Sequence, residues 1–283
     1  MKFDQILLTG SQTIKLFDLR SPRSTPYTAR TIDGLGPTEV DVQLGQTSQG
    51  AGIYIGRREQ LREITVNAYL NPNYMAGETP EQLRDAIYRL RPVNPDLSLD
   101  FRLMLNGDEV ASTPVYVKTV EISPYSKDNT LQIIVASTSG YLARKNPLVV
   151  PNPALDRLAP ILVNEGTAMT GFKIKIEITG QVDAIGFVMR TPFQAMSLQR
   201  LPGDAALFLG GDIIEIESTI GQRAIRYTRN GVTKSALAAL TPDSTWLTLY
   251  PGPNQLEYLQ SPVTDPPKYL WREFTHTPKY LGV

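Results

Sequence analysis

Trp246-Leu-Thr-Leu-Tyr-Pro-Gly-Pro-Asn254 is the stretch that says most about the fold of this chain. Along an extended strand, residues 246, 248 and 250 share one face, and Leu247 and Leu249 share the other. The Pro-Gly-Pro-Asn sequence then predicts a corner, because these residues favour turns over a central strand. None of these side chains titrates near neutral pH. The stretch therefore predicts a strand on which Trp246 caps the core of a β-sandwich, and it indicates a structural role.

Turn signals and alternating strands extend this β pattern along the chain. Asn106-Gly107 and Asn230-Gly231 are two-residue hairpin signals, and Leu201-Pro-Gly-Asp204 and Gly210-Gly-Asp212 predict further turns. In other segments apolar and polar residues alternate, as they do in a strand with one buried face and one wet face. The segments expected to be strands are Val115–Ile122, Thr130–Ala136, Lys173–Ile178, Asp212–Glu217 and Ala224–Thr228.

One helix is clearly indicated in this otherwise β chain. Thr79 is a helix N-cap residue, Pro80 suits the first helical position, and Gln82 can close a capping box with Thr79. Apolar residues then recur on one side of the helix up to Leu90. Arg91 precedes a proline, which disfavours helical backbone, so the helix is expected to end there.

Length and proline content suggest two domains. The chain has 283 residues, more than one domain usually contains. Four prolines fall within 145–160, where periodic residues are few, and this density indicates a stiff, extended connector. The fold class is therefore mainly β. We expect an N-terminal β-barrel or sandwich with one helix over 1–145, a Pro-rich linker over 146–160, and a C-terminal β-sandwich over 155–283.

Composition excludes several classes of function. The formal charges of the 28 basic and 28 acidic residues cancel. A protein that binds the phosphate backbone of nucleic acid usually carries a concentrated basic stripe instead. The chain has no cysteine, which rules out thiolate metal clusters, thiol nucleophiles and disulfides. The short apolar run at the start is unlike a secretory signal, and no stretch approaches the length of a membrane span. We expect synthesis in a cytoplasm and no membrane insertion.

Residues that could carry catalysis are few. His276 is the single histidine, and it lies near the C-terminus, where a rigid catalytic base is not expected. Glu215 and Glu217 share one face of a predicted strand and are the alternative, a carboxylate pair that cleaves glycans. Isoleucines occupy the opposite face, which makes the two glutamates the solvated side of that strand. The sequence therefore predicts no catalytic residue, no metal and no cofactor, and the chain is not expected to be an enzyme.

A sugar-binding sandwich remains an open alternative. Trp246, Trp271, Tyr250 and Tyr258 could serve as platforms on which sugar rings stack. This alternative requires an aromatic side chain that is exposed at a groove. For Trp246 the sandwich-core interpretation is favoured.

With these residues in view, the chain resembles the distal tail protein (Dit) family of bacteriophages with long, non-contractile tails. Two regions carry the resemblance, a block near the N-terminus that contains a short Gly-Leu turn, and the turn-rich C-terminal half. The similar stretches are Thr31–Val42, Gln49–Gly52, Arg57–Glu59, Ile64–Val66, Gly210–Asp212, Asn230-Gly231, Trp246–Asn254 and Pro278–Val283.

The resemblance implies a structural virion protein. Six copies would form a ring at the far end of the phage tail, with N-terminal domains closing a β belt around the DNA channel and galectin-like C-terminal sandwiches outside it. The ring would connect the tail tube protein to the tail-tip hub or central fibre protein, and DNA would only pass through. A carbohydrate-binding module used in host recognition is the alternative.

Two sets of residues follow as candidate sites. A charged segment beside a predicted strand suggests a subunit interface at Arg57, Arg58, Arg62 and Glu63. A second set is expected to shape the C-terminal corner, and it comprises Trp246, Pro251, Gly252 and Asn254.

Overall fold

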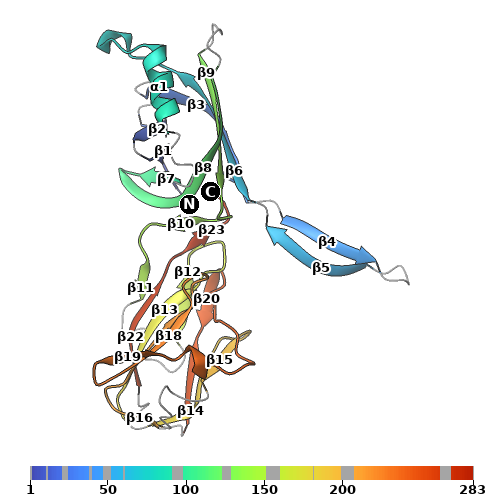
Figure 1. The fold of residues 1–283 in the computed structure, drawn as a ribbon, viewed down its shortest axis with the longest axis vertical. Helices are drawn as coiled ribbons and strands as arrows, with labels where there is room; N and C mark the ends of the chain where they lie inside the picture. The colour runs from blue at the N-terminus through green and yellow to red at the C-terminus, as the bar shows by residue number, and fades with distance from the viewer. Residues whose placement is uncertain are drawn as a thin grey trace. The chain divides into compact units, whose positions relative to one another are not determined.

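The computed structural model describes residues 2–10, 12–20, 25–37, 40–46, 52–59, 61–90, 98–122, 129–150, 160–180, 182–198, 207–261 and 269–282. The chain is mainly β and divides into two compact units (Figure 1). Unit 1 comprises Met1–Lys145 together with Tyr280–Val283, and unit 2 comprises Asn146–Lys279. Unit 2 is therefore inserted in the sequence of unit 1, which the chain leaves after Lys145 and rejoins at Tyr280.

This division differs from the expected boundaries in two places. The last residues, expected in the C-terminal domain, belong to unit 1, where Tyr280 packs against the core. Residues 148–150, which fall in the predicted linker, form strand β11 (Leu148–Val150), paired with β22 (Tyr269–His276). The density of prolines at 145–160 predicts an irregular segment, but it gives no information on the pairing of β11 with a strand that is distant in the sequence.

Unit 1 is built on one large sheet with the strand order β2-β1-β7-β8-β9-β6-β3, to which β10 and β23 are added. The long strand β8 pairs with β7 through its first half and with β9 through its second half, so it joins two parts of the sheet. The strands are β1 (Gln5–Thr9), β2 (Thr13–Asp18), β3 (Tyr27–Asp33), β6 (Arg62–Leu70), β7 (Leu99–Leu105), β8 (Asp108–Ile122), β9 (Thr130–Ser137), β10 (Leu142–Arg144) and β23 (Lys279–Tyr280).

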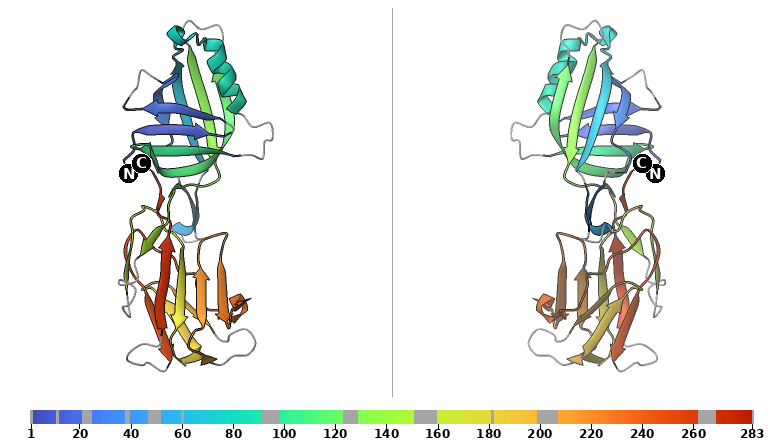
Figure 2. Two further views of the ribbon diagram at one scale, coloured as in Figure 1. Left: turned by 90° about the vertical axis from the view of Figure 1, so that its left-hand side faces the viewer. Right: turned by 90° about the vertical axis from the view of Figure 1, so that its right-hand side faces the viewer.

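Helix α1 (Pro80–Leu90) lies against this sheet and forms as the sequence predicts (Figure 2). The capping box is present: the Thr79 amide donates to Gln82 Oε1 at 3.0 Å, and the Gln82 amide donates to Thr79 Oγ1 at 3.3 Å. The apolar side of the helix enters the core, and the Tyr27 hydroxyl donates to the Leu83 carbonyl at 2.8 Å. A short 3-10 turn, η1 (Tyr74–Ala76), precedes the helix.

Unit 2 is a sandwich in which two principal sheets share one core. One sheet has the order β11-β22-β13-β17-β18-β19, and the other has the order β15-β14-β16 with β21 also paired to β14. Residues from both sheets fill a single apolar cluster, among them Ile174, Ile176, Met189 and Met196. The further strands are β12 (Ile161–Asn164), β13 (Phe172–Ile178), β14 (Val182–Arg190), β15 (Ala195–Leu198), β16 (Leu207–Phe208), β17 (Ile213–Glu217), β18 (Ala224–Arg229), β19 (Val232–Ser235), β20 (Gly252–Gln255) and β21 (Glu257–Ser261).

The predicted hairpins and strands are confirmed, with one exception. Asn106-Gly107 joins β7 to β8 and Asn230-Gly231 joins β18 to β19, and all four residues have positive φ, as a type I′ turn requires. The strand predicted at 246–250 is wrong, because only Leu249 forms a bridge, to Thr170. Leu201–Asp204 lies outside the described residues.

Candidate assembly surfaces

A separate β-hairpin in unit 1 offers an exposed apolar surface. β4 (Val40–Gln46) and β5 (Gly52–Glu59) pair with each other and form their own two-stranded sheet (Figure 1). Val42 is 51% exposed, Leu44 71% and Ile55 66%. A two-stranded hairpin is marginally stable by itself in water. The β4–β5 hairpin therefore has the properties of an element that packs against a partner.

Two of the predicted interface residues lie on this hairpin. In the strand register, Arg57 of β5 faces Val42 of β4, and Arg58 faces Asp41. The side chains of Arg57 and Arg58 lie outside the described part of the structure. Their backbone places them on the β4–β5 hairpin, two strand positions or more beyond the exposed Ile55.

Arg62 takes a different position from the one expected of an interface residue. It is 2% exposed, and its guanidinium donates to four backbone carbonyls, those of Gly34 at 2.8 Å, Gly36 at 3.0 Å, Gly140 at 3.0 Å and Leu281. Burial lowers the pKa of Arg62 from its ordinary value. Arg62 therefore fastens three distant segments of unit 1 to one another, and its guanidinium is not available to a neighbouring subunit.

The alternation of buried and exposed residues along β6 distinguishes Arg62 from Glu63. Arg62 is in phase with Ile64 and Val66, which are buried, whereas Glu63 is on the opposite, exposed face. The phase of the strand, and not the charge of the segment, therefore indicates which of the two side chains is exposed. Glu63 forms an ion pair with Lys118 of β8, and both side chains are about half exposed.

The exposed face around Glu63 is polar and internally hydrogen-bonded. Asn67 donates to Thr31 Oγ1 at 2.9 Å and accepts from Gln132 Nε2 at 2.9 Å. Nearby, Arg30 lies 3.4 Å from the Tyr69 hydroxyl, and residues on this face line an open pocket of about 640 Å³. The opposite side of the same strands forms the core of unit 1.

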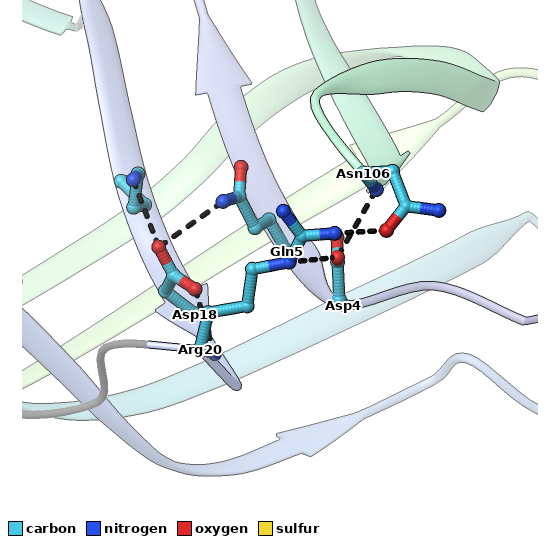
Figure 3. A network of polar contacts seen from close by, with 6 residues as sticks. Asp4, Gln5, Asp18, Arg20 and Asn106 are labelled. Atoms are coloured by element: carbon cyan, nitrogen blue, oxygen red, sulfur yellow. Dashed lines mark hydrogen bonds and ion pairs between the residues drawn. The ribbon is translucent and has the colours of Figure 1, made fainter.

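A carboxylate network fixes the end of the sheet where β1, β2 and the β7–β8 turn meet (Figure 3). Asp4 accepts from the Asn106 amide at 3.0 Å and pairs with Arg20 Nε at 2.7 Å. Asp18 accepts from Gln5 at 3.1 Å and from Lys15 at 2.9 Å. Both aspartates are buried and all these partners belong to unit 1, so the network stabilises this corner of unit 1.

The predicted C-terminal motif shapes a corner in unit 2. Asn254 is 7% exposed, and its side chain accepts from the Tyr250 amide at 2.8 Å and donates to the Tyr250 carbonyl at 2.7 Å. Gly252 has φ 88°, which other residues avoid, and Pro251 is exposed. Trp246 is half-buried against the core, with the Arg223 guanidinium 5.4 Å from its ring.

The side chains that the sequence offered for catalysis or sugar stacking, where they are described, are bonded or buried within unit 2. Glu215 is bound by Arg226 at 2.9 Å, and Glu217 lies on the same partly exposed face of β17. His276 and Trp271 are buried in unit 2, so Trp271 offers no exposed ring to a sugar. The side chain of Tyr258 lies outside the described residues. Within the described ranges no group of three His, Asp or Glu side chains could hold a metal ion, and no helix is long and apolar enough to cross a membrane.

Comparison with known proteins shows which of them share this fold. No protein-family model and no curated protein matches the chain. Among solved structures, it is similar to the crystal structure of the Dit protein of phage SPP1, described as a paradigm of the hub adsorption apparatus in phages that infect Gram-positive bacteria. The TM-score is 0.58 at 12% identity, over 97% of this chain and 98% of that one. The baseplate of phage P2 in its activated conformation with calcium is a weaker match, with a TM-score of 0.43 at 10% identity over 99% of each chain. The chain therefore has, over almost its entire length, the fold of a phage Dit protein.

Proposed function

We propose that the chain is a structural protein of a phage tail tip, present in the virion, and that six copies form a ring at the distal end of the tail. The ring connects the tail tube protein to the tail-tip hub or fibre protein, and DNA passes through it. The observation that carries this proposal is the agreement with the fold of the SPP1 Dit protein across both units. The role proposed is structural and not enzymatic.

Unit 1 is the ring-forming domain in this proposal. The β4–β5 hairpin leaves Val42, Leu44 and Ile55 exposed, and packing against the next copy would remove these side chains from water. A closed ring also leaves no unpaired strand edge between subunits. Arg57, Arg58 and Glu63 contribute the polar part of this interface. Arg62 is excluded from it by its burial inside the subunit.

Unit 2 is the peripheral domain, an independent β-sandwich carried outside the ring. Its strands form their own core, and among the described residues none from unit 1 contributes to that apolar cluster. The β-sandwich and the ring domain are thus two cores encoded in one chain, as a polypeptide of this length allows.

Native mass measurement tests the ring. At tens of micromolar, we expect a mass six or twelve times the 31.3 kDa of the chain. Leu44→Asp should abolish the hexamer, because it places a charge in the apolar surface of the β4–β5 hairpin. Ile220→Asp is the matched control, since Ile220 is 74% exposed in a turn of unit 2 and should leave the mass unchanged. A chain that stays monomeric both alone and with its tail tube protein contradicts the proposal.

A further inference from the structure

We propose that unit 2 carries a saccharide-binding site at the loop between β14 and β15, where the exposed Phe193 adjoins a polar pocket. The proposal goes beyond the structural role of the ring and does not rest on it. Every residue involved belongs to unit 2. Of the aromatic candidates that the sequence suggests, Trp271 is buried, whereas Tyr250 contacts Phe193, a residue that the sequence does not single out.

The pocket has the size of a small-ligand site, and its lining is more polar than that of most such sites. Its volume is about 320 Å³, and it is lined by Arg190, Thr191, Pro192, Gln255 and Glu257. Ligand pockets start at about 300 Å³ and hold a small number of polar groups that orient the ligand. Three strand ends supply this lining, those of β14, β20 and β21, so the polar groups stand on a rigid framework.

The polar groups of the pocket bond to one another and are balanced in charge. Arg190 Nε donates to Glu257 Oε2 at 2.7 Å, and Gln255 Nε2 donates to Glu257 Oε1 at 3.1 Å. A guanidinium has five N–H donors, so the contact with Glu257 leaves others directed elsewhere, and the Gln255 carbonyl is an acceptor. Because the ion pair cancels its own charge, the pocket favours a neutral ligand with many hydroxyl groups over an anion.

Phe193 provides an aromatic surface beside these polar groups. It follows directly on Pro192 of the pocket wall and is 78% exposed. Its ring contacts that of Tyr250 edge to face, with centroids 5.6 Å apart at 68°. The amides of Phe193 and Gln194 both donate to Thr191 Oγ1, at 3.4 and 3.2 Å, which orders the turn. Phe193 is therefore held outward, and its electron-rich face can receive the C–H groups of a sugar ring.

A peptide strand is a poorer occupant of this surface than a sugar. Peptides that add to a sheet need a free strand edge. The outer edge of β15 is already covered, because the Thr245 amide donates to the Ala195 carbonyl at 2.8 Å and the Thr241 amide donates to the Ser197 carbonyl at 3.0 Å. Beside this covered edge lie one exposed aromatic ring and a compact set of donors and acceptors, which suits a pyranose.

Binding to an array of bacterial cell-wall glycans, with neutral and phosphate-bearing members, tests the site in the full-length protein. We expect retention of neutral glycans. Phe193→Ala should weaken the affinity for them by about tenfold or more, as truncation of an aromatic anchor does. Gln255→Ala should also weaken it. Ile220→Ala is the control, because it removes a similarly exposed apolar side chain from another turn of unit 2.

The outcomes distinguish loss of the saccharide site from loss of folding or of the ring. Unchanged melting and native mass of Phe193→Ala, together with lost glycan retention, would support the site independently of the oligomeric state. The proposal is overturned if the wild-type protein retains no glycan, if it retains phosphate-bearing glycans alone, or if Phe193→Ala and Ile220→Ala behave alike.

Discussion

At the scale of single residues, Arg62 is the side chain that connects distant segments of unit 1. Its guanidinium joins the Gly34–Gly36 turn, the turn at Gly140 and the returning C-terminus at Leu281. Gly34 belongs to the same arrangement, because a Cβ on it would lie 1.9 Å from the Glu63 carbonyl oxygen. The backbone turn and the buried arginine are therefore adapted to each other.

Replacement of Arg62 by methionine should destabilise unit 1 strongly. The variant keeps most of the apolar stem but leaves four buried carbonyls without their donor, and we expect a loss of about 2–4 kcal/mol in the free energy of unfolding. Urea unfolding followed by circular dichroism measures it. Arg30→Met is the control, since Arg30 is exposed and its change should stay within about 0.5 kcal/mol. Equal losses in the two variants would contradict this role for Arg62.

Asp212 makes the stability of unit 2 depend on pH. Burial by itself would raise the pKa of Asp212, but hydrogen bonds from Arg229, the Leu209 amide and the Tyr227 hydroxyl, with the Arg229 charge, hold it below its ordinary value of 3.8. The Arg229 contacts are 2.9 and 2.6 Å long. Since the folded-state pKa lies below that of the unfolded chain, this contribution to stability is complete above pH 3.8 and is lost as the pH falls through the folded-state value.

An acid titration of stability checks this expectation. The free energy of unfolding of unit 2 should fall below about pH 4, and Asp212→Asn should be less stable at pH 7 with a smaller decline on acidification. Asp243→Asn, a change at an exposed aspartate of the same unit, is the control. If Asp212→Asn followed the same acid profile as the wild type, the stabilising role of the Arg229 contacts would be wrong.

At the scale of elements, the β4–β5 hairpin is the part whose environment should change on assembly. In a free subunit its amides are protected by one two-stranded ladder, so they should exchange with solvent rapidly. In a ring the same amides should be protected by orders of magnitude. Hydrogen exchange followed by mass spectrometry, on wild type and on Leu44→Asp, compares the two states. Equal exchange in both would contradict the proposed packing of the hairpin.

The sequence predicted those elements whose signals are local. The Thr79 capping box and the turn at Asn230-Gly231 each lie within a few residues, and both are present. The strand predicted at 246–250 does not form, because backbone polar groups of this segment bond to residues that are distant in the sequence. The Thr248 amide donates to the side chain of Gln194 at 2.8 Å, across 54 positions of sequence, in place of a ladder. The alternation of apolar and polar residues within the segment gives no indication of such a contact.

The candidate sites show the same limit. The exposed position of Glu63 and the structural roles of Gly252 and Asn254 can be read from alternation and turn chemistry. The guanidinium of Arg62 is different, because its acceptors come from turns that only the completed fold brings together. Phe193 gave no periodic signal, since it lies in a turn between two strands that the sequence did not identify.

At the scale of the whole molecule, the insertion of unit 2 into unit 1 predicts that unit 1 can be isolated. β10 and β23 are paired, so the chain leaves and re-enters unit 1 through neighbouring strands. Replacement of 146–278 by a short Gly-Ser linker should give a folded protein with the apolar core of unit 1. Circular dichroism and native mass measure folding and ring formation. A variant that cannot fold would show that unit 1 depends on the sandwich.

The contact between Arg62 and Leu281 spans 219 positions of the chain, and this has a consequence for biosynthesis. Domains usually fold one after another as they leave the ribosome. Here the earlier-synthesised part of unit 1 lacks its closing residues 280–282 until β22, the last strand of the inserted sandwich, has been translated. Gly282, whose Cβ would lie 2.7 Å from the Gly36 carbonyl carbon, completes the closure. A chain terminated before Tyr280 would lack this closing segment, so its unit 1 would remain without the contacts that Leu281 and Gly282 make.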